Sequence, residues 1–129
     1  MNKILVEVSV GELLDKISIL EIKKEKIKDT QKLKFITKEH QILKNQLDKN
    51  VKIDTKLSEL FDSLKEINSK LWVIEDNKRQ CEKDKDFGEA FIKLSRDVHF
   101  LNDDRAKIKL EINNHTGSVI KEIKEYTSY

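Results

Sequence analysis

Arg105 is the residue whose position in the sequence points most directly to chemistry. Apolar residues between positions 91 and 112 recur at spacings of three and four, which is typical of the buried side of a helix. Arg105 stands where this pattern requires an apolar side chain. A guanidinium there needs a carboxylate, an anionic ligand or a path to solvent. The pattern therefore favours an internal ion pair or a guanidinium that reaches solvent, with a contact to an anion in a pocket as the alternative.

Polar side chains follow two helical lines beside the apolar ones. One line lies between residues 68 and 82 and the other between residues 95 and 113. If the two lines face each other, or face the helix expected over 10–29, they form a polar groove with charges of both signs, which suits a small phosphorylated or carboxylate ligand. Alternatively, both faces are solvated and the charges pair along their own helices. The candidate groove residues are Trp72, Glu75, Asp76, Arg79, His99, Asn102, Asp103, Arg105 and Lys109.

Arginine is rare in this lysine-rich chain. Only three of the 26 basic residues are arginines, namely Arg79, Arg96 and Arg105. A guanidinium is planar and donates several hydrogen bonds in a fixed geometry, which an ammonium does not. We therefore interpret the stretch between residues 79 and 105 as the part of the chain where such geometry matters.

Metal and nucleophile signals are weaker. Glu12 with Asp15, and Glu59 with Asp62, each place two carboxylates on one helical face, as in the Mg²⁺-binding motifs of all-helical nucleotide pyrophosphohydrolases. The two pairs lie far apart in the sequence, however. The three histidines and Cys81 have no partner at ligand spacing, and there is no glycine-rich phosphate loop. We expect no metal and no cofactor, and whether the protein is an enzyme stays open.

The composition excludes several classes of protein. The 26 basic and 24 acidic residues are interleaved and give a net charge of +2, so a nucleic-acid-binding patch is not expected. No apolar run approaches the about 20 residues that span a bilayer, and the acid at Glu7 makes the first residues a poor secretion signal. A single cysteine excludes an internal disulfide and suits a reducing compartment. We therefore expect a cytoplasmic protein.

Apolar periodicity and capping signals predict one all-α domain over residues 1–129. Its two longest helices are separated by a short turn, so they must lie antiparallel as an αα-hairpin, on which the other helices close an antiparallel bundle. The β-branched residues between positions 3 and 8 predict a short strand or an extended arm. The expected elements are the arm over 1–8, helices over 10–29, 31–50, 55–84 and 87–114, and a short helix over 119–126.

Three stretches of the sequence stand out together: residues 9–23 (SVGELLDKISILEIK), residues 71–76 (LWVIED) and residues 102–109 (NDDRAKIK). Their combination resembles a family of small bacterial and phage proteins classed as a domain of unknown function. The resemblance extends over nearly the whole chain and implies a compact helical protein, but it supplies no activity. The residues that it would single out are Glu12, Asp15, Lys16, Trp72, Glu75, Asp76, Asn102, Asp103, Arg105 and Lys109.

Two functions from different classes remain open. The leading hypothesis is a helical interaction protein that associates with itself or with a helical partner. It rests on residues 10–29, Phe35 and Ile42, which give the helices more apolar faces than one bundle needs. The alternative is a small all-helical enzyme or ligand-binding protein acting on an anionic metabolite. In that case the positive charge would come from Arg79, Arg96, Arg105 and Lys109.

Overall fold

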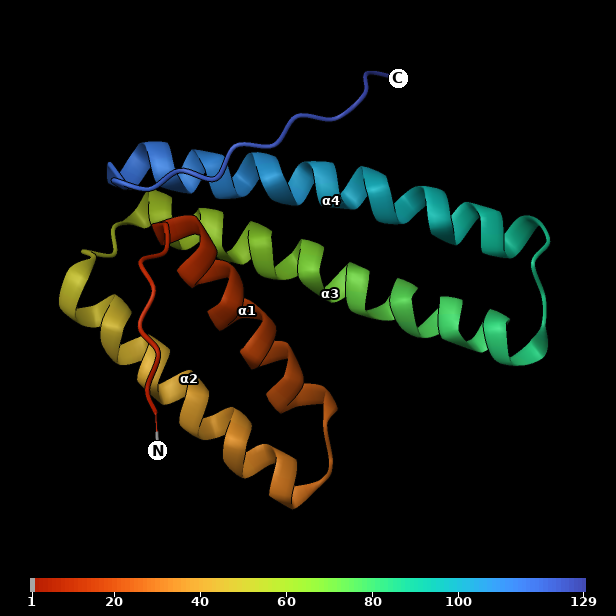
Figure 1. The fold of residues 1–129 in the computed structure, drawn as a ribbon, viewed down its shortest axis with the longest axis horizontal. Helices are drawn as coiled ribbons and strands as arrows, with labels where there is room; N and C mark the ends of the chain where they lie inside the picture. The colour runs from red at the N-terminus through yellow and green to blue at the C-terminus, as the bar shows by residue number, and fades with distance from the viewer. Residues whose placement is uncertain (1) are drawn as a thin grey trace.

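The computed structural model describes residues 2–129 and contains four α-helices joined by short connections (Figure 1). No β-strand occurs among these residues, so the all-helical class is confirmed. None of the helices in this part of the chain has the length and apolar character needed to cross a membrane. The helices are α1 (Val10–Lys26), α2 (Thr30–Asn50), α3 (Thr55–Asp84) and α4 (Glu89–Thr116).

Side-chain caps define where three of the helices begin. The Ser9 hydroxyl accepts a hydrogen bond from the backbone N–H of Glu12 at 3.0 Å, as the spacing of these residues predicts. Asp29 caps α2 and Asp54 caps α3 in the same way. Because Asp29 is used as the cap of α2, α1 ends at Lys26 and not at residue 29 as expected.

The ends of α4 also differ from the predicted ends. Asp86 accepts a hydrogen bond from the backbone N–H of Gly88 at 3.1 Å, which closes a turn over residues that were expected to be helical. The helix therefore begins at Glu89, with Gly88 as its N-cap. At its other end α4 continues to Thr116, where Gly117 adopts the left-handed conformation (φ 65°) that ends many helices.

The helices form two hairpins, and α1 is central to the fold. α3 and α4 lie antiparallel along their whole lengths, while α1 and α2 form a shorter hairpin that crosses one half of this pair (Figure 1). α1 packs against α2, α3 and α4, which explains why its several apolar faces are buried within one chain. The centre of the core consists of Leu14, Ile17, Leu57, Leu64 and Ile112, all at most 1% exposed.

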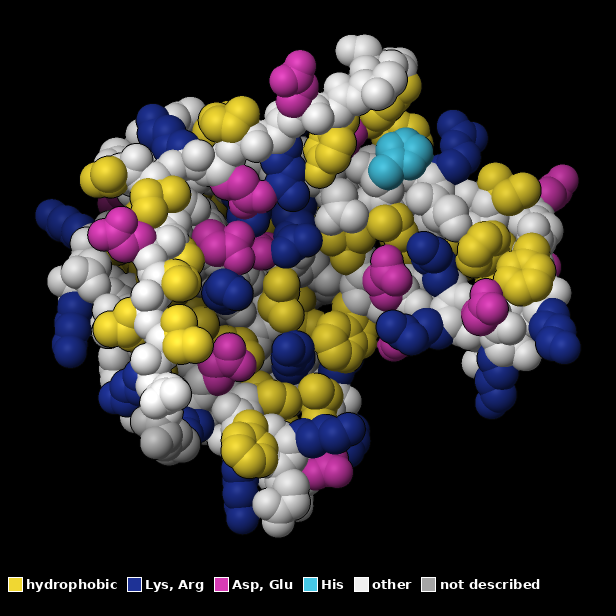
Figure 2. Space-filling model, viewed as in Figure 1, with side chains coloured by type: hydrophobic (Ala, Val, Ile, Leu, Met, Phe, Trp, Pro, Cys, Tyr) yellow, Lys and Arg dark blue, Asp and Glu magenta, His cyan; other side chains and the backbone are white. Residues whose placement is uncertain are grey.

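The other half of the long hairpin extends beyond α1 and α2. We call residues 73–101, which comprise the end of α3, the turn and the first half of α4, the distal hairpin. Figure 2 shows hydrophobic side chains and charges of both signs on this protruding end, and a hollow between it and the α1/α2 hairpin. Val73, Phe87 and Ile92 are each about half exposed here.

At the N-terminus the extended arm is observed and the short strand is not, whereas the short helix expected near the C-terminus does not form. Residues 3–8 are an extended, exposed arm without a strand, because a strand needs a partner and none lies beside it in residues 2–129. The helix expected over 119–126 is also wrong, since these residues are extended along α4. An eight-residue helix is marginal by itself, and the side chains of this segment bind α4 instead.

Candidate functional site

A buried ion pair joins α1 to α4. The carboxylate of Asp15, whose side chain is only 2% exposed, accepts hydrogen bonds from Arg105 Nε at 2.9 Å and from Arg105 Nη2 at 2.5 Å. Asn68 of α3 donates a further hydrogen bond to Asp15 at 2.9 Å and one to the Ser18 hydroxyl at 2.8 Å. The carboxylate that Arg105 requires is therefore supplied from within the chain.

The hydrogen bonds decide the charge state of this pair. Burial alone would raise the pKa of Asp15, but the hydrogen bonds from Arg105 and Asn68 outweigh it and hold the pKa below its usual value of 3.8. The hydrogen bonds to Asp15 likewise raise the pKa of Arg105. Both groups are therefore charged at neutral pH, and the ion pair is the form that the fold has to accommodate.

Lys109 lies one helical turn beyond Arg105 and is surrounded by acids. Its ammonium is 2.7 Å from a carboxylate oxygen of Glu12, 2.9 Å from one of Glu122 and 4.0 Å from one of Asp15. Burial alone would lower the pKa of Lys109, yet the hydrogen bonds with Glu12 and Glu122 raise it above its usual value. We call the cluster of Glu12, Asp15, Asn68, Arg105 and Lys109 the polar junction.

Gly11 lets the start of α1 lie directly against α4 beside the polar junction. A Cβ atom on Gly11 would lie 2.5 Å from the backbone oxygen of Lys109 and 3.0 Å from Oδ1 of Asn113. The Gly11 backbone N–H donates to that same Asn113 oxygen at 2.7 Å. Only glycine permits this approach, so its position fixes where Glu12 and Asp15 meet α4.

We expect Gly11→Ala to lower the free energy of unfolding by about 1–3 kcal/mol, because α1 and α4 must separate to admit the methyl group. The loss would occur although alanine is the better helix former by about 1 kcal/mol. Chemical denaturation measures it. In Gly88→Ala, the matched control, the new Cβ meets only the Asp86 side chain at 3.3 Å, so a change below about 1 kcal/mol is expected. Equal losses in both variants would contradict the close-approach argument.

A groove of about 810 Å³ opens over the polar junction, between α4 and the extended segment that follows it. Arg105 and Lys109 lie on its floor, and Glu122, Tyr126 and Tyr129 belong to the wall formed by residues 118–129. Five of the predicted site residues line this groove: His99, Asn102, Asp103, Arg105 and Lys109.

The predicted site residues of α3 do not join them. Trp72 is half-buried, while Glu75, Asp76 and Arg79 are exposed on the protruding half of the helix. The two polar lines therefore do not face each other across one groove as hypothesised, because the apolar seams of α3 and α4 occupy the space between the helices. The three arginines do not converge either, since Arg96 packs 5.9 Å over the ring of Phe100 and only Arg105 reaches the junction.

Several residues in or beside the polar junction were missing from the candidate groove residues. Asn68 and Ser18 had a weak signal, since both are polar residues among buried apolar ones. Glu122 had none, because its contact with Lys109 depends on the path of residues 118–129. Glu12 and Asp15 do share a helical face, but they bind Lys109 and Arg105. Residues 2–129 contain no group of three or more His, Cys, Asp or Glu side chains arranged to hold a metal ion.

Comparison with known proteins assigns the family. A family model described as a family of unknown function (DUF6165) matches residues 4–129. The chain belongs to this family. The match with DUF6165 includes all four helices, so the polar junction and the distal hairpin both lie inside it. No curated protein and no solved structure matches the chain.

Proposed function

We propose that the protein is a helical interaction protein that associates with a second copy of itself through the distal hairpin. The observation that carries the proposal is the change in burial along one apolar seam. Where α1 covers the α3/α4 pair, Leu57, Leu64 and Ile112 are at most 1% exposed. In the distal hairpin the same seam is only half-buried, at Ile74, Phe91, Leu94 and Val98. Two helices alone cannot enclose the apolar stripe between them.

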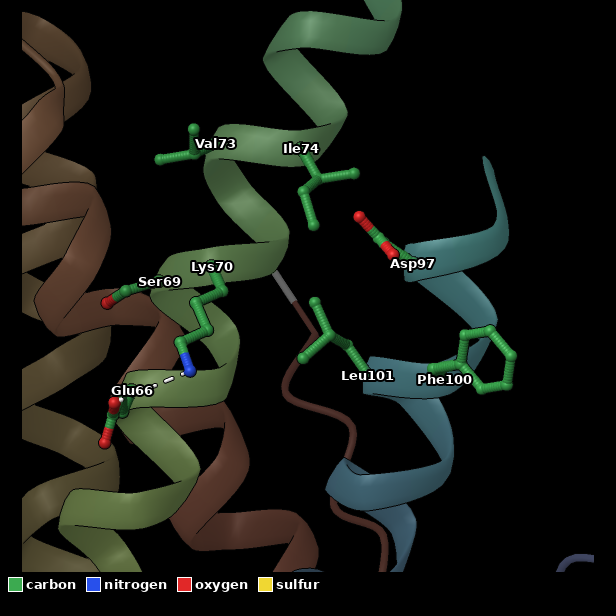
Figure 3. A pocket seen from close by; sticks show the side chains of 8 residues that line it. All are labelled: Glu66, Ser69, Lys70, Val73, Ile74, Asp97, Phe100 and Leu101. Atoms are coloured by element: carbon green, nitrogen blue, oxygen red, sulfur yellow. Dashed lines mark ion pairs between the residues drawn. The ribbon is translucent and has the colours of Figure 1, made fainter. Parts of the chain in front are cut away.

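An apolar groove marks the start of this uncovered region. It has a volume of about 670 Å³ and lies between α3 and α4. Ile74 and Leu101 point into the space between the helices, and Val73 and Phe100 flank it (Figure 3). Val73 is 48% exposed and Phe100 is 37% exposed. Such apolar surface at the base of a protruding element is typical of a protein–protein contact.

The charges around the groove favour a second copy as the partner. Glu66 pairs with Lys70 on α3, and Lys93 pairs with Asp97 on α4, so each helix presents both signs. A surface of this kind is self-complementary when two copies meet about a two-fold axis, because each charge then has the opposite charge available on the partner. Pairing of two distal hairpins would make a four-helix bundle in which the half-buried seam is enclosed.

Val73→Lys tests the proposal. We expect sedimentation equilibrium to show a dimer of the unaltered chain. In the variant the dissociation constant should rise at least about tenfold, because a lysine would have to be buried against the partner. Phe35→Lys is the matched control, since Phe35 is a 76% exposed apolar residue on α2, away from the distal hairpin. A chain that stays monomeric at high concentration, or dimerisation lost in Phe35→Lys and kept in Val73→Lys, would overturn the proposal.

The alternative, an anionic metabolite bound by Arg105 and Lys109, gains no support from the site. Both cations are already paired with carboxylates of the chain. An anion would have to displace Glu12 or Glu122 or compete with buried Asp15, at a cost in broken charge-assisted hydrogen bonds.

We place the self-association in the cytoplasm, in keeping with the single, unpaired cysteine.

A further inference from the structure

Residues 118–129 form one wall of the groove over the polar junction, and they lie there like a bound peptide. The segment leaves α4 at Gly117 and runs back along the same helix in an extended conformation (Figure 1). Near its start, the Ser118 hydroxyl accepts a hydrogen bond from the backbone N–H of Val10 at 3.2 Å. Its further contacts are made by side chains at two positions seven residues apart.

The first of these positions is Glu122, whose carboxylate binds Lys109 at 2.9 Å. Lys109 is 8% exposed and its ammonium also donates to Glu12, so its position does not depend on Glu122 alone. The second position is Tyr129. Its ring lies edge-on to His99 and Phe100, with ring centres 5.4 Å apart in each case, and its hydroxyl donates to Asp103. The segment is thus bound to α4 through a carboxylate at one position and an aromatic ring at the other.

The segment itself contributes little apolar burial. Val119 is fully exposed, and Ile123, Tyr126 and Tyr129 are each at least 60% exposed. Segments with few buried apolar contacts open at low cost in free energy. Opening would leave the α4 side of the groove in place, because the ion pairs of Arg105 with Asp15 and of Lys109 with Glu12 do not involve residues 118–129.

We propose that the surface of α4 beneath residues 118–129 is a peptide-binding site for an extended segment of a partner protein, and that residues 118–129 cover it in cis as a competing strap. The partner segment presents a glutamate to Lys109 and, seven residues later, a tyrosine or phenylalanine to His99 and Phe100. The strap lowers the apparent affinity for the partner by the fraction of molecules in which it is closed. This site adjoins the distal hairpin and shares His99 and Phe100 with it, but its contacts with Glu122 and Tyr129 all lie within one chain and do not require self-association.

The test uses a fluorescently labelled peptide with the sequence of residues 118–129, titrated into the full chain and followed by anisotropy. Glu122→Gln in the full chain removes the carboxylate of the strap. We expect the peptide to bind this variant about tenfold more tightly than it binds the unaltered chain, because the strap competes less well. The same substitution made in the peptide is expected to weaken binding about tenfold. One change thus acts in opposite directions on the two sides of the contact.

Glu125→Gln is the matched control, because Glu125 lies in the same segment and has no ion pair among residues 2–129. It alters the net charge equally and is expected to leave both affinities unchanged. Equal effects of Glu122→Gln and Glu125→Gln would reduce the result to net charge and overturn the proposal. So would a peptide whose affinity does not depend on its own glutamate. Both affinity measurements use substitutions in the exposed segment, so neither requires a variant of buried Lys109.

Discussion

Arg105→Met is expected to lower the free energy of unfolding by about 3 kcal/mol, near the lower end of what removing one partner of a buried ion pair costs. The substitution leaves the Asp15 carboxylate, which is 2% exposed, with Asn68 as its remaining hydrogen-bond donor and Lys109 4.0 Å away. Lys109 and the 29% exposure of the Arg105 side chain keep the loss from being larger. Urea denaturation at neutral pH measures it.

Two comparisons show whether the loss comes from the uncompensated carboxylate. Arg105→Met combined with Asp15→Asn is expected to recover about half of the lost stability, because the uncompensated buried carboxylate is then removed. Lys93→Met breaks an exposed ion pair with Asp97 and should cost at most about 1 kcal/mol. If the double variant is less stable than Arg105→Met alone, the ion pair is not the source of the effect.

The pH dependence of the free energy of unfolding gives a second test of Arg105→Met. Because the pKa of Asp15 is lowered in the folded protein, its contribution to stability is present above 3.8 and is lost as the pH falls through the lower, folded value. Without Arg105, burial raises that pKa, so acid protonates the folded form more readily and stabilises it relative to the unfolded chain. The difference in stability between the unaltered protein and Arg105→Met should therefore begin to narrow above 3.8, where Asp15 of the folded variant takes up its proton, and should narrow further as the pH falls through the lowered folded pKa of the unaltered protein.

The helices could be predicted because local signals agree with the packing. Capping residues stand at Ser9, Asp29 and Asp54, and the apolar seams of α3 and α4 are long enough to outweigh single exceptions. The seam of α3 nevertheless drifts. Spacings of three and four residues continued from Leu60 and Leu64 would place Ile67 in this seam, whereas the structure buries Asn68, at 6% exposed, and leaves Ile67 half-buried. A strict heptad corresponds to about 3.5 residues per turn, whereas a straight α-helix has about 3.6, so the buried face shifts gradually around α3. α1 packs on the side toward which this face shifts.

The sequence could predict only those features of the candidate site that follow from a residue's position in its own helix. Arg105 indicated a nearby carboxylate because a cation stands at an apolar position of the helix. A cation at such a position needs compensation in any fold. The sequence gives no reason why Glu75, Asp76 and Arg79 should be exposed, because that depends on where α1 stops covering the long hairpin. Nor can it place Glu122 on Lys109, since a segment without periodicity has no preferred face.

Leu64→Ala should be the most costly change in the apolar core, since Leu64 is 0% exposed at the place where α1 covers the seam. Loss of about 2–5 kcal/mol is expected, with a melting temperature lower by roughly 10 °C. Leu94→Ala removes the same atoms from the half-buried part of the seam, so at low protein concentration it should cost about half as much.

The two leucines should differ further in how their effects depend on concentration. Association of distal hairpins would raise the melting temperature of the unaltered chain with increasing concentration, because the partner binds only the folded form. Leu64→Ala keeps the distal surface, so its deficit in melting temperature should stay constant across a concentration series. The deficit of Leu94→Ala should grow, because this leucine belongs to the seam that the second copy encloses. Parallel curves for all three proteins would mean that the half-buried seam is open to solvent in the protein's working state, and that the apolar surface of the distal hairpin is not a contact between copies.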